Sequence, residues 1–393
     1  MQEKAKEPEI RFAGFTGAWE QRKLGAIVQI TMGQSPDGST YSDTPADYIL
    51  VQGNADLKNG WVCPRVWTTQ KTKFATAGDL IMSVRAPAGS VGKTAYDVVL
   101  GRGVASLKGN EFIYQSLVKM DFDGYWKAES TGSTFESLSS DSISTAELYC
   151  PSEDEQHKIG IFLSRLDSLL TLHQRKYEKL LNIKKSMLEK MFPKEGEVVP
   201  EIRFKGFTGA WEQRKLNEIA DVYDGVHQTP KYTSSGVRFL SVENIATLES
   251  EKYISEADFI RDFKIFPQKG DILMTRIGDI GTAKVIKSDE KYAFYVSLAL
   301  LKPKHINSDF LCNSIASKNF QKGLKARSLL TAIPLKINKE EIGKVATSFP
   351  LNLSEQEKIG SFFNHIESLL TLHQRKLEML KNVKQAFLEK MFV

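Results

Sequence analysis

Arginines, lysines, small hydroxyls and amides recur in the glycine-rich turns of this chain, where they could contact phosphates and base edges. Two phrases share one composition, GDLIMSVRAPAGSVGK from Gly78 and GDILMTRIGDIGTAKV from Gly270. Each predicts a Gly-Asp turn, an apolar strand, an arginine and a glycine-rich loop. Arg85 and Arg276 lie at these junctions, and arginine can donate two hydrogen bonds to guanine. The recurrence favours nucleic-acid contact, and a solvated or salt-bridged arginine remains the alternative.

Other candidate contact residues lie in turns after short β-like runs, or in polar tracts after helices expected near 111–127 and 308–324. Hydroxyls and basic groups there suit phosphate and base-edge contacts, and they also suit an ordinary surface loop. The complete set of candidate DNA-binding residues is Gln34, Ser35, Arg85, Arg102, Ser130, Thr131, Ser133, Thr134, His227, Gln228, Lys231, Tyr232, Arg276, Lys325, Arg327 and Ser328.

No catalytic or cofactor-binding pattern is visible in the sequence. The phrases FAGFTG and FKGFTG invite a nucleotide-loop interpretation, but a phosphate cradle needs a strand before the glycines and a helix after them. Phe12, Phe15 and Trp19 are better explained as packing anchors. The chain has no GxxxxGK[ST], no HExxH and no paired CxxC. We therefore expect no catalytic residue, no metal site and no cofactor in this chain.

A repeated frame must position the candidate residues. The phrase PEIRFAGFTGAWEQRKL, from Pro8 to Leu24, returns from Pro200 to Leu216 with a single change, Ala13 to Lys205. LLTLHQRK and LEKMF also occur twice. The segments between the repeats, insert 1 (25–150) and insert 2 (217–352), diverge. Such a pattern indicates one activity that acts on two different targets. The internal repeats also define the architecture of the chain.

The repeated C-terminal segments predict two long helices of ~37 residues, hence ~55 Å each. Ser152 and Ser354 are the expected N-caps, and Pro193 is expected to end the first helix. Apolar positions alternate in steps of four and three, the heptad pattern of a coiled coil. The order of the repeats favours antiparallel pairing. The predicted seam contains Leu163, Leu166, Leu170, His173, Tyr177, Leu180, Phe363, Ile366, Leu370, His373, Leu377 and Leu380.

His173 and His373 are explained as polar seam residues that set the register, rather than as metal ligands. Cys63, Cys150 and Cys312 are odd in number and far apart, which predicts reduced thiols rather than disulfides or a zinc site. The charged N-terminus lacks the apolar core of a signal peptide. No apolar run approaches the ~20 residues of a membrane helix. These features are typical of a cytoplasmic protein.

The charge is distributed unequally between the inserts. Insert 1 has 10 Lys and Arg against 13 Asp and Glu, whereas insert 2 has 19 against 16. Because nucleic-acid binders usually present a basic surface, bulk charge supports DNA binding for insert 2 alone. To bind DNA, insert 1 would need a local basic cluster or the help of a partner protein.

The expected fold class is α+β, with two globular domains joined by two long helices in an antiparallel coiled coil, and with an internal pseudo-two-fold repeat. The expected division is 1–24 (constant segment), 25–150 (insert 1), 151–192 (first long helix), 193–216 (linker and second constant segment), 217–352 (insert 2) and 353–393 (second long helix).

As a set, the repeated FxGFTGAWEQRKL phrases, the GDLIM and GDILM strands and the EQxKIG…LLTLHQRK helices resemble the specificity subunit of type I restriction-modification systems. This resemblance covers nearly the whole chain. It implies that the inserts are target recognition domains that each read half of a split DNA sequence, and that the coiled coil sets the gap. It further implies two methyltransferase subunits that use S-adenosylmethionine, and two motor–nuclease subunits that use ATP and Mg.

Two other functions remain open. A coiled-coil scaffold that binds two protein ligands would suit the negative insert 1. A fused methyltransferase is a third possibility, and the absent catalytic motifs argue against it.

Overall fold

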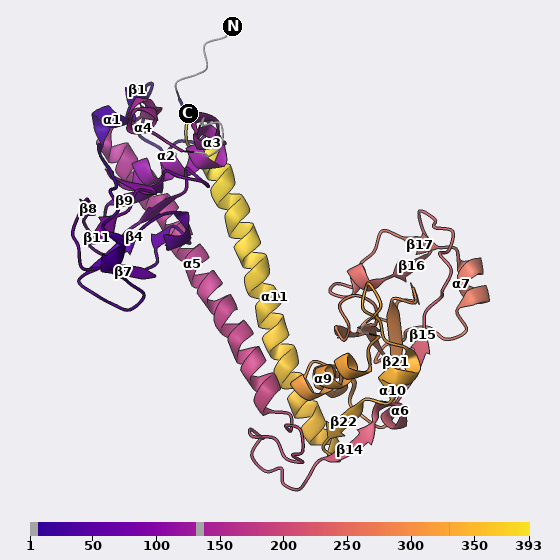
Figure 1. The fold of residues 1–393 in the computed structure, drawn as a ribbon. Coiled ribbons are helices and arrows are strands. Elements are labelled where there is room, and N and C mark those ends of the chain that lie inside the picture. The colour runs from indigo at the N-terminus through magenta and orange to yellow at the C-terminus, as the bar shows by residue number, and fades with distance from the viewer. Residues whose placement is uncertain (1–6, 131–136, 330) are drawn as a thin grey trace. The chain divides into compact units, whose positions relative to one another are not determined.

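The computed structural model describes residues 7–130, 137–329 and 331–393, and it contains two compact units. Unit 1 consists of Met1–Arg175 and Gln374–Val393, and unit 2 of Lys176–His373. Helices α5 (Glu153–Lys190) and α11 (Leu353–Lys390) each contribute one half to either unit. They are the magenta and yellow helices of Figure 1. Each unit is therefore a constant segment, an insert and halves of both long helices.

The shorter elements of unit 1 are β1 (Glu20–Lys23), α1 (Leu24–Ile27), β2 (Gln29–Met32), β3 (Tyr41–Ser42), β4 (Tyr48–Val51), β5 (Leu57–Lys58), β6 (Trp61–Val62), β7 (Val66–Thr68), β8 (Phe74–Ala75), β9 (Leu80–Ser83), β10 (Val91–Lys93), β11 (Val98–Leu100), β12 (Val104–Lys108), α2 (Glu111–Phe122), α3 (Tyr125–Glu129), α4 (Ser140–Thr145) and β13 (Glu147–Cys150).

The shorter elements of unit 2 are β14 (Glu212–Lys215), α6 (Leu216–Ile219), β15 (Ala220–Asp224), β16 (Val237–Leu240), β17 (Tyr253–Ile254), α7 (Glu256–Asp262), β18 (Ile272–Thr275), β19 (Ala283–Val285), β20 (Tyr292–Phe294), β21 (Leu298–Pro303), α8 (Ser308–Ile315), α9 (Lys318–Arg327), α10 (Lys339–Gly343) and β22 (Ala346–Phe349).

The inserts share a sheet topology although their sequences diverge. One sheet of insert 1 runs β2-β12-β9-β10-β6-β5, and its counterpart in insert 2 runs β15-β21-β18-β19. In both, the strand from the Gly-Asp phrase lies between two antiparallel neighbours. A second sheet pairs β4 with β11 in parallel, as β16 pairs with β20. The prediction of a mixed α and β fold with two repeated domains is therefore confirmed.

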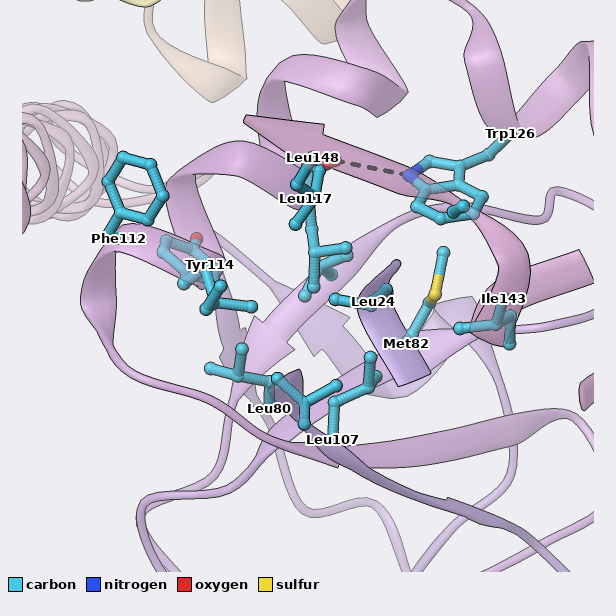
Figure 2. Close-up of a cluster of buried hydrophobic side chains, with 14 of the residues drawn as sticks. Leu24, Leu80, Met82, Leu107, Phe112, Tyr114, Leu117, Trp126, Ile143 and Leu148 are labelled. Carbon is cyan, nitrogen blue, oxygen red and sulfur yellow. Dashed lines mark hydrogen bonds between the residues drawn. The ribbon is translucent and has the colours of Figure 1, made fainter. Parts of the chain in front are cut away.

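The core of unit 1 lies between the main sheet and the helices that cover it. Leu80, Met82 and Leu107 project from β9 and β12 towards Leu117 and Trp126, all of them buried (Figure 2). The Trp126 indole donates a hydrogen bond to the Leu117 carbonyl at 3.3 Å. Alternation along β12 and β9 sends every second side chain into this core, while Ile81 and Val104 pack in a second cluster on the opposite face.

Each constant segment is anchored by the same ion pair. Arg11 donates hydrogen bonds to both carboxylate oxygens of Glu155, at 2.7 and 2.8 Å, and to the Gly17 carbonyl at 2.7 Å. Arg203 binds Glu355 at the same two distances and the Gly209 carbonyl at 2.6 Å. Both glutamates lie in the first turn of a long helix and are buried. The segment is thus fixed by a bidentate, charge-assisted contact in each unit.

Within each unit, the beginning of one long helix lies beside the end of the other. In unit 1, Phe162 of α5 packs against Phe387 of α11 with 4.8 Å between ring centroids. In unit 2, Phe192, just beyond α5, lies 6.1 Å from Phe363 of α11. The predicted anchors Trp19 and Phe12 join this packing, against Phe392 and Phe162 respectively.

The helix starts differ in part from the prediction. Helix α5 begins directly after Ser152, as expected, but α11 begins at Leu353, so Ser354 lies inside the helix. The prediction of Ser354 as N-cap is wrong. The side chain that accepts a hydrogen bond there is Asn352, from the Ser354 N–H at 2.9 Å. Asn352 and Ser354 are both of N-cap type and only two residues apart, so residue type alone does not decide between them.

Gly160 and Gly360 allow the inserts to approach the long helices closely. A Cβ atom on Gly160 would lie 2.9 Å from Glu111 Cβ, and one on Gly360 would lie 2.8 Å from Asp309 Cβ. Both contacts are closer than packed carbon atoms tolerate. The glycines therefore let the first turns of α2 and α8 sit directly against α5 and α11.

The helices expected near 111–127 and 308–324 are each interrupted. The chain leaves α2 at Asp123 and Gly124 before α3, and it leaves α8 at Ala316 and Ser317 before α9. Across the described residues, none of the helices is apolar over a length that could cross a membrane.

Candidate nucleic-acid interface

Three strand ends meet at one edge of the main sheet in insert 1. Strands β2 and β9 end beside the start of β12, where Met32 pairs with Ala105 and Ser83 with Val104. The edge is closed by hydrogen bonds from the Gly33 N–H to the Val104 carbonyl and from the Val84 N–H to the Gly103 carbonyl, both 2.9 Å. The loops that carry the predicted contact residues therefore lie side by side.

This edge brings together four of the predicted residues of insert 1. Gln34, Arg85 and Arg102 are exposed, and Ser35 is half-buried. The Ser35 hydroxyl accepts a hydrogen bond from the Arg102 backbone N–H at 3.1 Å, which joins two of the loops. Among the described residues, neither guanidinium forms an ion pair. Within the part of insert 1 that the structure describes, this edge thus has two cations without an ion-pair partner, despite the negative balance of the insert.

Sequence reasoning missed a basic loop beside this edge. The Thr72 hydroxyl donates to the Gln34 carbonyl at 2.6 Å, and Lys71 lies 3.9 Å above the Phe74 ring. The sequence Lys71-Thr72-Lys73 was the available signal, but only the long-range contact places it next to Gln34.

The same region also carries a fixed negative charge. The Ser39 hydroxyl and N–H hydrogen-bond to Asp37 and lower the pKa of its carboxyl.

Ser130 is not available for contact with a ligand. Its side chain is buried and donates to the Lys127 carbonyl at 2.9 Å, at the end of α3. The prediction of a solvent-facing hydroxyl is wrong here, because a serine after a helix can satisfy the last carbonyls. Thr131, Ser133 and Thr134 lie outside the described residues.

Insert 2 repeats this edge with different side chains. Strands β15 and β18 end beside the start of β21, where Asp224 pairs with Ala299 and Thr275 with Leu298. The following loop presents His227, Gln228, Lys231 and Tyr232, all exposed. Tyr232 packs edge-on against Phe239 at 5.6 Å and lies 5.7 Å from the Lys252 ammonium. The ring is therefore held in place and partly open to solvent.

Two predicted residues of insert 2 lie in a helix rather than in a loop. Lys325 and Arg327 belong to the last turn of α9, whose preceding turns begin at Lys318. Lys325 is exposed, and Arg327 lies 3.3 Å from Glu341. Ser328 is buried and donates to the Leu324 carbonyl at 2.8 Å. The prediction of a solvent-facing hydroxyl is therefore wrong for Ser328 too.

The two junction arginines are not equivalent. The Leu138 N–H binds the Val84 carbonyl at 2.9 Å, and the Ile337 N–H binds the Arg276 carbonyl at 3.0 Å. Arg85 forms the next backbone bridge of insert 1, and Ile277 forms it in insert 2. Arg276 therefore corresponds to Val84, and Arg85 to Ile277. A shift of one residue moves a side chain to the opposite face of a strand.

Arg276 consequently points into its domain. It is 7% exposed, pairs with Asp224 and donates from Nε to the Ile337 carbonyl at 3.0 Å. For this residue the salt-bridged alternative is the one observed, and we remove it from the candidate contact set. The two arginines lie close together in the two phrases but do not occupy equivalent positions, so the recurrence does not support DNA contact by Arg276.

We expect Arg276→Ala to lower the free energy of unfolding by ~2 kcal/mol, because it strands a buried carbonyl and a partly buried carboxylate. Arg85→Ala is the matched control and should change stability by less than ~0.5 kcal/mol, since the side chain is exposed. Urea unfolding of both variants measures this difference. Equal stabilities would show that the buried pair contributes nothing to the fold.

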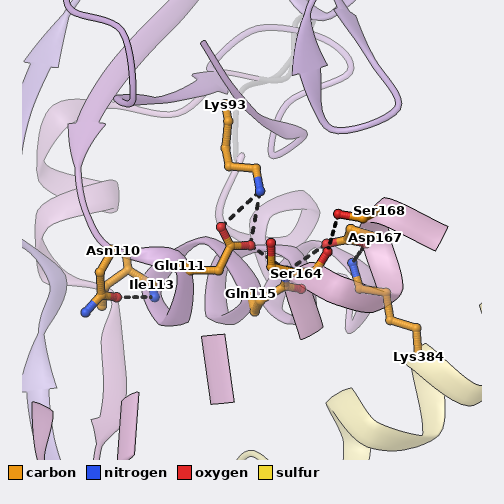
Figure 3. A network of polar contacts seen from close by, with 9 residues as sticks. All are labelled: Lys93, Asn110, Glu111, Ile113, Gln115, Ser164, Asp167, Ser168 and Lys384. Carbon is orange, nitrogen blue, oxygen red and sulfur yellow. Dashed lines mark hydrogen bonds and ion pairs between the residues drawn. The ribbon is translucent and has the colours of Figure 1, made fainter. Parts of the chain in front are cut away.

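A polar network links insert 1 to both long helices (Figure 3). Lys93 pairs with Glu111 at 2.9 Å, and Gln115 donates to Glu111 at 3.0 Å and to Asp167 of α5 at 2.8 Å. Lys384 of α11 binds the same Asp167 at 2.6 Å. In unit 2, Lys287 binds Asp309 and Lys184 binds Glu367. In unit 1 these contacts join insert 1 to both helices, whereas in unit 2 one pair lies within insert 2 and the other joins α5 to α11.

The predicted seam residues differ in burial. Leu163 and Leu377 of unit 1 and Phe363, Ile366 and Leu370 of unit 2 are buried. The remaining members, His173 and His373 included, are half-buried; they are Leu166, Leu170, His173, Tyr177, Leu180, His373 and Leu380.

The described residues contain no group of His, Cys, Asp and Glu side chains suited to a metal ion. All three cysteines are free thiols.

Comparison with known proteins gives the chain a family context. The family model described as the type I restriction modification DNA specificity domain matches residues 17–182 and 209–382. The type I restriction enzyme MjaVIII specificity subunit of Methanocaldococcus jannaschii is 21% identical over 397 residues, covering 93% of this chain and 90% of that protein.

Two further relatives agree. The putative MjaX specificity subunit of the same organism is 27% identical over 180 residues, 43% of this chain and 41% of that protein. The match thus spans less than half of that relative. Among solved structures, the S subunit of a type I restriction-modification system from M. genitalium superimposes with a TM-score of 0.65 at 15% identity, over 98% of this chain and 99% of that one.

Proposed function

Because this chain belongs to the family of type I restriction-modification DNA specificity subunits, we propose that its inserts are target recognition domains. Each domain reads one half of a split sequence in double-stranded DNA. The observation that carries this proposal is the shared sheet edge. Both inserts present exposed amide, cationic or aromatic side chains from equivalent strand ends.

The chemistry of these edges suits DNA. Arg85, Arg102, Lys231 and Lys325 can neutralise phosphates, and such contacts supply much of DNA affinity. Gln34 and Gln228 can pair with adenine through two hydrogen bonds. The side chains differ between the inserts while the edges correspond. Two domains built in this way would read different half-sites in one frame.

The long helices would act as an antiparallel coiled coil that sets the gap between half-sites. Buried Leu163 and Leu377 in unit 1 and Phe363 and Ile366 in unit 2 support a seam. The cross-helix pair of Asp167 with Lys384 supports a defined register in unit 1. Charged pairs at the flanks of a seam select partner and orientation.

A second apolar stripe on the same helices supports docking of partner subunits. Leu169, Leu172 and Met379 of unit 1 are 43%, 45% and 56% exposed, and Leu372 of unit 2 is 45% exposed. A helix with apolar residues on two faces suits a bundle of more than two helices. Two methyltransferase subunits would dock on this frame, and two motor–nuclease subunits would join them. S-adenosylmethionine, ATP and Mg would be held by those partners, and this chain would not be an enzyme.

A coiled-coil scaffold that binds two protein ligands is the second candidate. The excess of acidic residues in insert 1 favours it. The exposed Arg85 and Arg102 at the sheet edge argue against it, because they supply the local basic cluster that DNA binding requires.

Selection from a pool of random duplexes by the methyltransferase-bound complex tests the proposal. We expect enrichment of a split consensus, two short half-sites at a constant gap. No enrichment would support the scaffold instead. Methyl transfer by this chain alone would show that it is an enzyme.

A further inference from the structure

Ile333 is the most exposed large apolar side chain of the described residues. It is 98% exposed, whereas Ile260, the next, is 71% exposed. The adjacent Pro334 is also exposed. Burying an isoleucine is worth ~1.5–3 kcal/mol, so the fold forgoes that stabilisation at this position.

The backbone at the base of this loop is firmly held. The Leu329 N–H donates to the Lys336 carbonyl and the Gly278 N–H to the Leu335 carbonyl, both at 2.8 Å. Arg276 Nε binds the Ile337 carbonyl at 3.0 Å. Ile333 therefore projects from a loop whose two sides are tied to each other and to the end of β18.

Charges of both signs lie near the base of this loop, where Asp279 is exposed beside Gly278. Lys325 and Lys336 are exposed, and among the described residues neither forms an ion pair. The loop follows α9, and its base is hydrogen-bonded to the residues after β18, where Arg276 binds Asp224 at the end of β15. The tip thus belongs to the same edge as His227 and Gln228. An exposed apolar side chain at an edge that also carries cations fits a groove whose walls are phosphates and whose floor is bases.

We infer that Ile333 recognises a thymine of the half-site of insert 2 through the thymine 5-methyl group. This inference rests on the proposed function. Isoleucine cannot accept or donate a hydrogen bond, so it can distinguish bases only by apolar contact. Among the base edges of the major groove, the 5-methyl of thymine is the group that offers such contact. The residue acts as a specificity determinant and takes no part in methyl transfer.

Uracil in place of thymine removes that methyl and nothing else, so it gives a direct test. The methyltransferase-bound complex is titrated with duplexes in which each thymine of the insert 2 half-site is replaced in turn by uracil. We expect one position to weaken binding about fourfold, from ~0.8 kcal/mol per methyl-sized group. Ile333→Ala should bind the thymine duplex about fourfold more weakly than the wild type does. Replacing that thymine by uracil should not weaken the binding of the variant any further. Ile260→Ala, an exposed isoleucine of the same domain, should bind every duplex like the wild type.

The outcomes separate the inference from the proposed function. If the wild-type complex ignores every base of this half-site, the proposed function fails. If it discriminates bases but no thymine shows coupling to Ile333, the inference fails and the function stands. In a third outcome, Ile333→Ala weakens binding of the thymine and uracil duplexes equally, and 2-aminopurine at one base step fluoresces more strongly only when the wild type binds. Ile333 is then a wedge between bases, and the inference is overturned. Unchanged urea unfolding of Ile333→Ala excludes a folding defect.

Discussion

Arg11→Ala is expected to lower the free energy of unfolding by ~3 kcal/mol, because it leaves the buried carboxylate of Glu155 without its partner. The Glu155 side chain is 1% exposed and that of Arg11 16% exposed. The same guanidinium also binds the Gly17 carbonyl, so the variant loses contacts within the constant segment and to α5, while the packing of Phe12 on Phe162 remains. Arg203→Ala should give the same loss through Glu355 in the second unit. Urea unfolding followed by circular dichroism measures both.

Arg22→Ala is the matched control from the same segment. Its ion pair with Glu20 joins side chains that are 49% and 67% exposed, and exposed pairs contribute less than ~1 kcal/mol. A loss for Arg11→Ala no larger than that for Arg22→Ala would show that the repeated ion pair does not hold the frame together.

Insertion of four residues after both Arg175 and Arg375 is expected to lengthen the gap between half-sites by one or two base pairs. Each helix grows by ~6 Å, nearly two base pairs of rise at ~3.4 Å each. Four residues almost complete a turn, so the seam rotates by only ~40°. The DNA must also rotate by ~70° over two base pairs, and this opposes the full increase. Duplex selection with the complex reads the new gap directly.

Insertion in one helix alone is the control. It displaces Asp167 from Lys384 and one seam from the other, so we expect loss of specific binding rather than a new gap. An unchanged gap with full activity after the double insertion would show that the helices do not measure distance.

The repeated frame could be predicted because its signals are local or periodic. The aromatic anchors Phe12 and Trp19 follow from residue type, and the structure packs both of them. Of the twelve predicted seam positions, five are buried and seven are half-buried. The Gly-Asp strands were also correct, as β9 and β18. The sequence indicated the close approach at Gly160 only as an unexplained glycine in a helix.

The contact edges could be predicted only in part. Arg85 is the eighth residue of its Gly-Asp phrase and Arg276 the seventh of its own, and this offset of one residue places them on opposite faces. Ser130 and Ser328 bond to preceding carbonyls, a choice that composition does not reveal. The loop at Lys71 and the tip at Ile333 reach the edge through backbone hydrogen bonds between segments far apart in the sequence. No local sequence pattern predicts hydrogen bonds between segments so far apart.

Replacement of residues 25–150 by the corresponding insert of another specificity subunit tests the central claim most directly. Methylation-sensitive sequencing of DNA modified by the wild-type and chimeric complexes reads both half-sites and the gap together. We expect one half-site to change completely, while the other half-site and the gap stay the same. A change in both half-sites, or in neither, would contradict the account of two independent recognition domains in one constant frame.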